Sequence, residues 1–149
     1  MRQFMNIVEE ASIRSKVESM FKIFGGKQYA FSNLPQAGKN AVQVYWADEF
    51  GLEISPNSLW GYVEIPVEAL KQAIGGMEDH PDFEAYHQWY TAGGDIPDYS
   101  NADYAVILDN IYEEEVILDG WHRFHDYVRK GVKNIPAVLQ ISNDITEAV

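Results

Sequence analysis

Residues 116–139 constrain the fold of this chain more than any other segment. Three apolar residues, Val116–Leu118, are followed directly by Asp119-Gly120 and then by an amphipathic stretch. Gly131 ends that stretch, and a second apolar run follows Pro136. This succession predicts a strand, a tight turn, a helix and a second strand. A helix that starts directly after such a turn presents unpaired backbone N–H groups and a partial positive charge, which favours an anion such as phosphate.

The rest of the chain divides into helical and extended patterns without repeats or a clear domain linker. Helices are predicted at residues 5–24, 68–74 and 82–92. Strands are predicted at residues 29–31, 41–47, 60–67, 105–108 and 135–141. Loops or turns are predicted at residues 35–40, 48–57 and 95–103, where polar residues, Gly and Pro gather. Residues 1–60 are interpreted as an N-terminal extension packed on the same core as residues 61–149.

Two local patterns give sharper expectations. Val42, Val44 and Trp46 alternate with Gln43 and Tyr45, which predicts a strand over 41–47. A proline cannot donate to a sheet ladder, so Pro66 predicts an edge strand or a strand end. The large aromatic side chains of Trp46 and Trp60 are expected in the core, which is their common role.

The charge of the chain is uneven. Residues 1–60 carry six basic and six acidic side chains, whereas residues 61–149 carry five basic and seventeen acidic ones, so the second part holds the whole net charge of −12. Four of those five basic residues gather near the motif: Arg123, Arg129, Lys130 and Lys133. This basic island favours an anion site, and the acidic surroundings argue against binding to duplex nucleic acid. Basic residues in a last helical turn also suit the helix dipole without any ligand.

The composition excludes several classes of protein. There is no cysteine, which excludes disulfides, thiolate metal sites and cysteine nucleophiles. No apolar run approaches the length of a membrane span, and the first residues lack the apolar core of a signal peptide, so a cytoplasmic protein is expected. His122 and His125 are three residues apart, but nothing completes a recognised metal-ligand spacing, so no histidine-ligated metal is expected.

Each candidate site residue has a functional and a structural interpretation. Gly120 allows close approach of a ligand or a positive φ, and Asp119 binds the ligand or caps the helix. Arg123 binds phosphate or pairs with a carboxylate. His122 donates to phosphate or acts as an acid or base, whereas His125 is expected to be a surface histidine without a role.

Asp119-Gly120-Trp121-His122-Arg123, with Tyr127, Gly131 and Ile135-Pro136, resembles the Asp-Gly-His-His-Arg signature of the ParB/sulfiredoxin superfamily. The resemblance extends over residues 63–141. It implies an α+β fold with a small mixed sheet and flanking helices. It also implies a nucleotide site in which Asp119, Gly120, Trp121, His122 and Arg123 hold the phosphates of ATP or another NTP. The reaction implied is NTP hydrolysis or phosphoryl transfer, with Mg²⁺ brought by the nucleotide. From side-chain chemistry, His122 and Glu68 are the catalytic candidates, and Asp119, Glu64 and Glu68 are the carboxylates that could contact the Mg²⁺.

The chain also departs from its relatives. Trp121 stands where sulfiredoxin-like members carry the reactive cysteine, so sulfinic acid repair is excluded. Trp121 either stacks on a base or packs below the turn, and we expect packing. Only about ten residues follow the last predicted strand, so the helix-turn-helix of partition-type members is not expected.

A second hypothesis needs no nucleotide. A small acidic interaction protein, such as a phage-encoded inhibitor, would use carboxylates of residues 64–119 to occupy the basic nucleic-acid-binding surface of a partner protein. An acidic surface also serves solubility, so charge alone does not decide between the two hypotheses.

Overall fold

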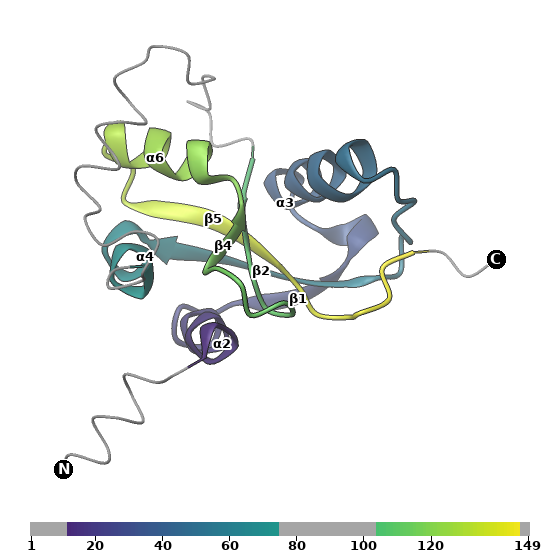
Figure 1. Ribbon diagram of the computed structural model, residues 1–149, viewed down its shortest axis with the longest axis horizontal. Helices are drawn as coiled ribbons and strands as arrows, with labels where there is room; N and C mark the ends of the chain where they lie inside the picture. The colour runs from purple at the N-terminus through teal and green to yellow at the C-terminus, as the bar shows by residue number, and fades with distance from the viewer. Residues whose placement is uncertain (1–11, 75–103, 147–149) are drawn as a thin grey trace.

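The computed structural model describes residues 12–74 and 104–146 of the chain. These residues form a five-stranded mixed sheet with helices on both faces (Figure 1). The strands are β1 (Lys27–Ala30), β2 (Leu59–Pro66), β3 (Val106–Leu108), β4 (Ile117–Asp119) and β5 (Asn134–Gln140). The predicted α+β class is confirmed. The predicted helix at 82–92 and the predicted loop at 95–103 lie outside the described residues.

The sheet has the order β1-β2-β5-β3-β4. β2 is antiparallel to β1 and to β5, and its register with β5 runs from Trp60–Gln140 to Pro66–Asn134. β3 is parallel to β5 and antiparallel to β4. β5 therefore lies at the centre, and the two strands of the motif segment, β4 and β5, are separated by β3.

The three inner strands are apolar on both faces. In β5, Ile135, Ala137 and Leu139 belong to one core cluster, whereas Val138 belongs to the other. Neighbouring side chains of a strand point to opposite faces, so this division follows directly from the two-residue period. Trp60 lies in the second cluster, and Val63 and Ile65 of the same strand lie in the first. Both faces consequently require a covering layer.

Among the residues that the structure describes, three helices cover the first face: α2 (Ile13–Ile23), α4 (Val67–Ile74) and α6 (Trp121–Arg129). The Ser12 hydroxyl caps α2 by accepting the backbone N–H of Ser15 at 3.0 Å. α2 ends before Gly25, which has φ +76°, and this end agrees with the helix predicted up to residue 24. Figure 1 shows these three helices on the side of the sheet away from α3.

A continuous helical segment covers the second face. It consists of α3 (Gln36–Val42) and a π-helical stretch, η2 (Gln43–Glu49). The prediction of a loop at 35–40 and a strand at 41–47 was therefore wrong. Its physical reason is an ambiguous spacing, because Val42 and Trp46 fit a strand alternation and are also one helical turn apart. The buried residues of this segment recur at helical spacing: Gly38, Ala41, Val42 and Trp46.

Several other predictions are confirmed by the structure. The strands predicted at 60–67, 105–108 and 135–141 match β2, β3 and β5, and the helix predicted at 68–74 matches α4. Pro66 is the last residue of β2, which is an inner strand, so its role is to end the strand. Trp46 and Trp60 are buried together with ring centroids 4.9 Å apart. β1 and β2 pair within one sheet, so a division at residue 60 runs through β2.

No helix within residues 12–74 and 104–146 is long and apolar enough to cross a membrane.

Truncation of Leu70 tests its place in the first core cluster. Leu70 is 0% exposed on α4, whereas Leu59 is 44% exposed at the start of β2. We expect Leu70→Ala to lower the free energy of unfolding by about 2–5 kcal/mol, because it leaves a cavity. Leu59→Ala, the matched control, should change it by less than about 1 kcal/mol. Urea unfolding followed by tryptophan fluorescence measures both, and equal losses would contradict the assignment of this core.

Candidate functional site

The predicted strand–turn–helix junction is present. β4 ends at Asp119, and α6 begins at Trp121. Between them Gly120 has φ +101°, a value that side chains other than glycine rarely adopt. A Cβ at this position would also lie 3.3 Å from the Cα of Val106. Gly120 is thus required by the turn and by close packing on β3, whether or not a ligand approaches it.

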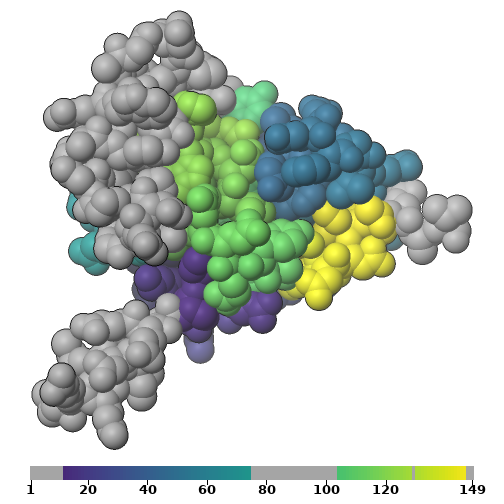
Figure 2. All heavy atoms as spheres, viewed as in Figure 1, coloured from purple at the N-terminus to yellow at the C-terminus, as the bar shows by residue number. Residues whose placement is uncertain are grey.

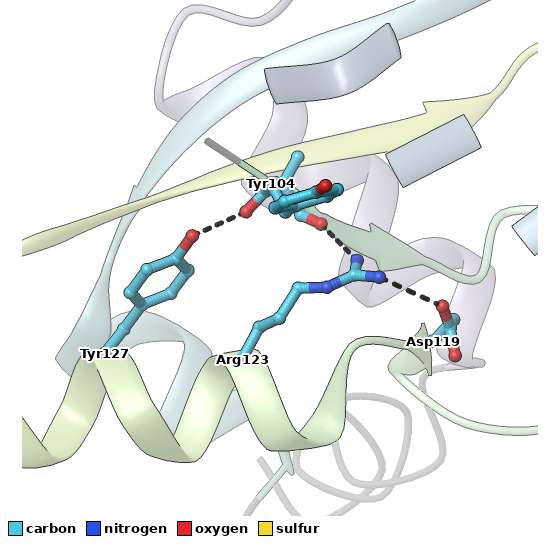
Figure 3. A network of polar contacts seen from close by, with 5 residues as sticks. Tyr104, Asp119, Arg123 and Tyr127 are labelled. Carbon is cyan, nitrogen blue, oxygen red and sulfur yellow. Dashed lines mark hydrogen bonds and ion pairs between the residues drawn. The ribbon is translucent and has the colours of Figure 1, made fainter. Parts of the chain in front are cut away.

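Arg123 points into the molecule. It is 6% exposed, and its Nη1 donates to the backbone oxygen of Ala105 at 2.8 Å. Its guanidinium lies over the Tyr104 ring, 5.3 Å from the centroid, and its Nη2 is 3.6 Å from Asp119 Oδ2. Tyr127, one helical turn later, donates its hydroxyl to the backbone oxygen of Tyr104 at 2.6 Å (Figure 3). Arg123 and Tyr127 together tie α6 to the chain that enters β3.

The other residues of the first turn of α6 differ in exposure. His122 is exposed, as a phosphate-binding or catalytic residue would need to be. Trp121 packs edge-on against Phe124 and donates its indole N–H to Glu115 Oε2 at 3.0 Å, so it packs at the turn as expected. His125 is fully buried and stacks on Trp121. The expectation of a surface histidine at 125 was wrong, because α6 packs along this side against the first core cluster.

Asp119 does not cap α6. The N-cap residue is Gly120, which has no side chain that could make a capping hydrogen bond. Burial raises the pKa of Asp119 above its ordinary value, and Glu49 raises it further, whereas Arg123 opposes the shift. Burial outweighs the ion pair because the 3.6 Å separation is longer than a hydrogen bond. The ionised carboxylate of Asp119 would therefore be stabilised by an additional cation.

The two predicted catalytic residues are not brought together. Glu68 lies on α4 with its side chain 80% exposed and 3.8 Å from Lys71 Nζ. It lines a hollow with Val128 and Lys133, at the C-terminal end of α6. His122 lies at the opposite end of that nine-residue helix, and such a helix is roughly 13 Å long. A shared catalytic step for Glu68 and His122 is not supported by this arrangement.

A pocket of about 510 Å³ opens beside β4, between η2 and the chain leading into β4. Its lining is mostly aromatic and aliphatic: Tyr45, Trp46, Phe50, Leu52, Tyr112, Glu114 and Leu118. Phe50 is 57% exposed and Tyr112 is 49% exposed, so large apolar surface faces solvent here. Figure 2 shows the α3–η2 segment and the segment starting at Tyr104 side by side on the surface. We call this site the aromatic pocket.

The aromatic pocket has acidic surroundings. Glu114 is part of the lining, and none of the lining residues in the described part of the chain is basic. Burial raises the pKa of Tyr45, and the negative charges of Asp119, Glu49 and Glu114 raise it further. These carboxylates are close enough to disfavour a second anion at the ring, and they would favour a cation there. A phosphate near this pocket would need a metal ion to offset the charge.

Asp109 organises the loop that brings Tyr112 and Glu114 to the pocket. Its Oδ1 accepts the backbone N–H groups of Ile111 and Tyr112 at 3.1 and 2.7 Å. Its Oδ2 accepts those of Glu114 and Glu115 at 2.8 and 3.3 Å. A buried carboxylate with four such donors fixes the loop in one conformation.

Comparisons of this chain with protein-family models, with curated proteins and with solved structures find no match. The ParB/sulfiredoxin resemblance therefore stays a prediction. Within residues 12–74 and 104–146, no three histidine or acidic side chains gather in a way that could hold a metal ion.

Sequence reasoning missed the aromatic pocket. Tyr45 was assigned to a strand, and Phe50 and Leu52 were assigned to a polar loop. One signal was present, since large apolar residues stand among Asp48, Glu49 and Glu53 without a helical or strand period. Such residues cannot all be buried locally, which is typical of a binding surface.

Replacement of Gly120 tests whether the turn between β4 and α6 requires glycine. Gly120→Ala should lower the free energy of unfolding by about 1–3 kcal/mol through backbone strain, with the contact to Val106 adding to the loss. Gly25→Ala is the matched control, because Gly25 also has a positive φ but nothing lies within 4 Å of an added Cβ. Chemical unfolding of both variants measures the difference, and a Gly120 variant as stable as the Gly25 variant would contradict the close packing on β3.

Proposed function

We propose that this chain is an acidic interaction protein whose surface around the aromatic pocket binds a basic segment of a partner protein. The observation that carries this proposal is the combination of exposed aromatic side chains with Glu49, Glu114 and Asp119 on one surface. Interfaces are enriched in aromatic residues at their centre and polar residues at their rim. A carboxylate rim selects basic partners and repels nucleic acid.

Two further features support this proposal. The net charge of −12 adds a long-range attraction to basic surfaces. Three of the six large apolar residues exposed within the described part of the chain, Phe50, Leu52 and Tyr112, line this pocket. Proteins whose basic grooves bind nucleic acid offer the complementary charge, so they are the class of partner proposed.

Charge reversal at the pocket tests the proposal. The probe is a soluble lysine–arginine copolymer, titrated at low and at physiological salt by fluorescence anisotropy. Glu49→Lys with Glu114→Lys should weaken binding on the order of tenfold at low salt, and raised salt should reduce that difference. The matched control is Glu18→Lys with Glu68→Lys, on α2 and α4 across the sheet, which makes the same change in net charge. Equal weakening by both pairs would mean that total charge, rather than this surface, drives binding.

A second proposal retains the predicted nucleotide site. It is favoured by the junction itself, where α6 begins directly after the Gly120 turn and His122 is exposed in its first turn. The phosphates of ATP or another NTP would lie at this helix start, with Mg²⁺ offsetting the negative charge of Asp119 and of the phosphates. The buried Arg123 would act by holding α6 in place rather than by direct contact.

His122 is the residue whose replacement separates these two functions. We expect micromolar binding of Mg²⁺–ATP that weakens at least roughly tenfold in His122→Ala, because one charge-assisted contact to phosphate is lost. Calorimetric titration with ATP, ADP, CTP and GTP, each with and without Mg²⁺, measures it. Arg123→Ala is unsuitable alone because it also removes the hydrogen bond to Ala105. No binding of any of the four nucleotides would refute the nucleotide proposal and leave the interaction proposal standing.

A further inference from the structure

The geometry of the aromatic pocket points to one chemical group within the proposed basic partner. We propose that the pocket takes an arginine side chain, with its guanidinium between aromatic rings and its charge facing Glu114. This inference rests on the proposed function, since it names the part of the partner that is recognised. It adds a specificity for arginine over lysine that a carboxylate surface alone would not have.

The arrangement of the aromatic rings favours a planar cation. Tyr45 lies edge-on to Trp46 with centroids 4.8 Å apart and edge-on to Phe50 with centroids 5.1 Å apart. Trp46 is only 4% exposed, so the accessible ring faces are those of Tyr45 and Phe50, which are set nearly perpendicular to each other. Tyr112, from a separate segment of the chain, contributes a further ring to the lining. A planar cation stacks on such faces, and arginine does so more often than lysine.

The weaker hydration of a guanidinium group also favours arginine over lysine in this pocket. The lining is mostly apolar, with Glu114, the tyrosine hydroxyls and the Trp46 indole N–H as its polar groups, so a group that enters loses part of its water. A guanidinium is more weakly hydrated than an ammonium, and its fork of donors matches a carboxylate. A pocket of about 510 Å³ leaves space for the aliphatic stem of the side chain as well as its head.

The pocket wall formed by the loop with Tyr112 and Glu114 is held rigidly, which favours binding. The loop with Tyr112 and Glu114 is fixed by the four hydrogen bonds to Asp109. Two more hydrogen bonds hold the loop: Arg14 Nε donates to the backbone oxygen of Asn110 at 2.9 Å, and Asn110 Nδ2 donates to the backbone oxygen of Gln140 at 3.1 Å. A pocket wall that is already ordered loses little conformational entropy on binding.

Two peptides of equal charge test the inference: acetyl-Gly-Gly-Arg-Gly-Gly-amide and its lysine counterpart. Each is titrated into the full chain while the backbone amide signals of Glu114 and Leu118 are followed by NMR. The arginine peptide should shift these signals and bind roughly five- to tenfold more tightly than the lysine peptide. Tyr112→Ala and Glu114→Gln should each reduce that preference at least about threefold. Ile23→Ala and Glu18→Gln, at exposed positions of α2, are the matched controls and should leave it unchanged.

The outcomes distinguish this inference from the function on which it rests. Equal affinity for both peptides, or shifts confined to other residues, would overturn the arginine pocket. If the copolymer still bound and still depended on Glu49 and Glu114, the interaction proposal would stand without it. If neither the peptides nor the copolymer bound, both would fall. Tyr112 and Glu114 are exposed, so their variants should fold, and circular dichroism confirms this before the titrations.

Discussion

The burial of the central sheet on both faces is the constraint on which the rest of the structure depends. β5 presents Ile135, Ala137 and Leu139 to one face and Val138 to the other, and exposed apolar area costs about 25 cal/mol per Å². One layer of helices cannot satisfy both faces. α2, α4 and α6 cover the first, so the second requires the α3–η2 segment (Figure 1). That covering segment also supplies Tyr45 and Trp46, and Phe50 follows it directly, so the aromatic pocket is a consequence of closing the second face.

In α6, the residues expected to bind a ligand instead hold the helix against the rest of the protein. Arg123, Tyr127 and the Gly120 turn all act on the start of β3. A buried guanidinium needs partners for its donors, and a backbone oxygen, a carboxylate and an aromatic face provide them. His122 remains directed to solvent, so any contact of α6 with a nucleotide is centred on His122 rather than on Arg123.

The electrostatics of the surface favour a cation over an anion at the aromatic pocket. Glu49 ends η2, whereas Glu114 precedes β4 and Asp119 ends it, and all three raise the pKa of Tyr45 beyond the effect of burial. The basic island found in the sequence is divided by the fold, because Arg123 is buried and Lys130 pairs with Asp126 at 3.0 Å near the other end of α6. Sequence proximity of like charges therefore did not produce a basic patch at the helix start.

The sequence by itself determined the strand–turn–helix–strand unit of residues 116–139, β2 with its end at Pro66, and the two core tryptophans. These features depend on the spacing of apolar residues and on the backbone geometry of glycine and proline, and both are determined by neighbouring residues. Only the tertiary structure decided that residues 36–49 are helical. The spacing of Val42 and Trp46 fits a strand as well as a helix, and the helix forms because it covers the second face of the sheet. The tertiary structure also decided that Arg123 points inward, that Glu68 and His122 are apart, and that η2 meets the loop of Tyr112. Those outcomes depend on contacts between segments distant in sequence, and no local pattern encodes them.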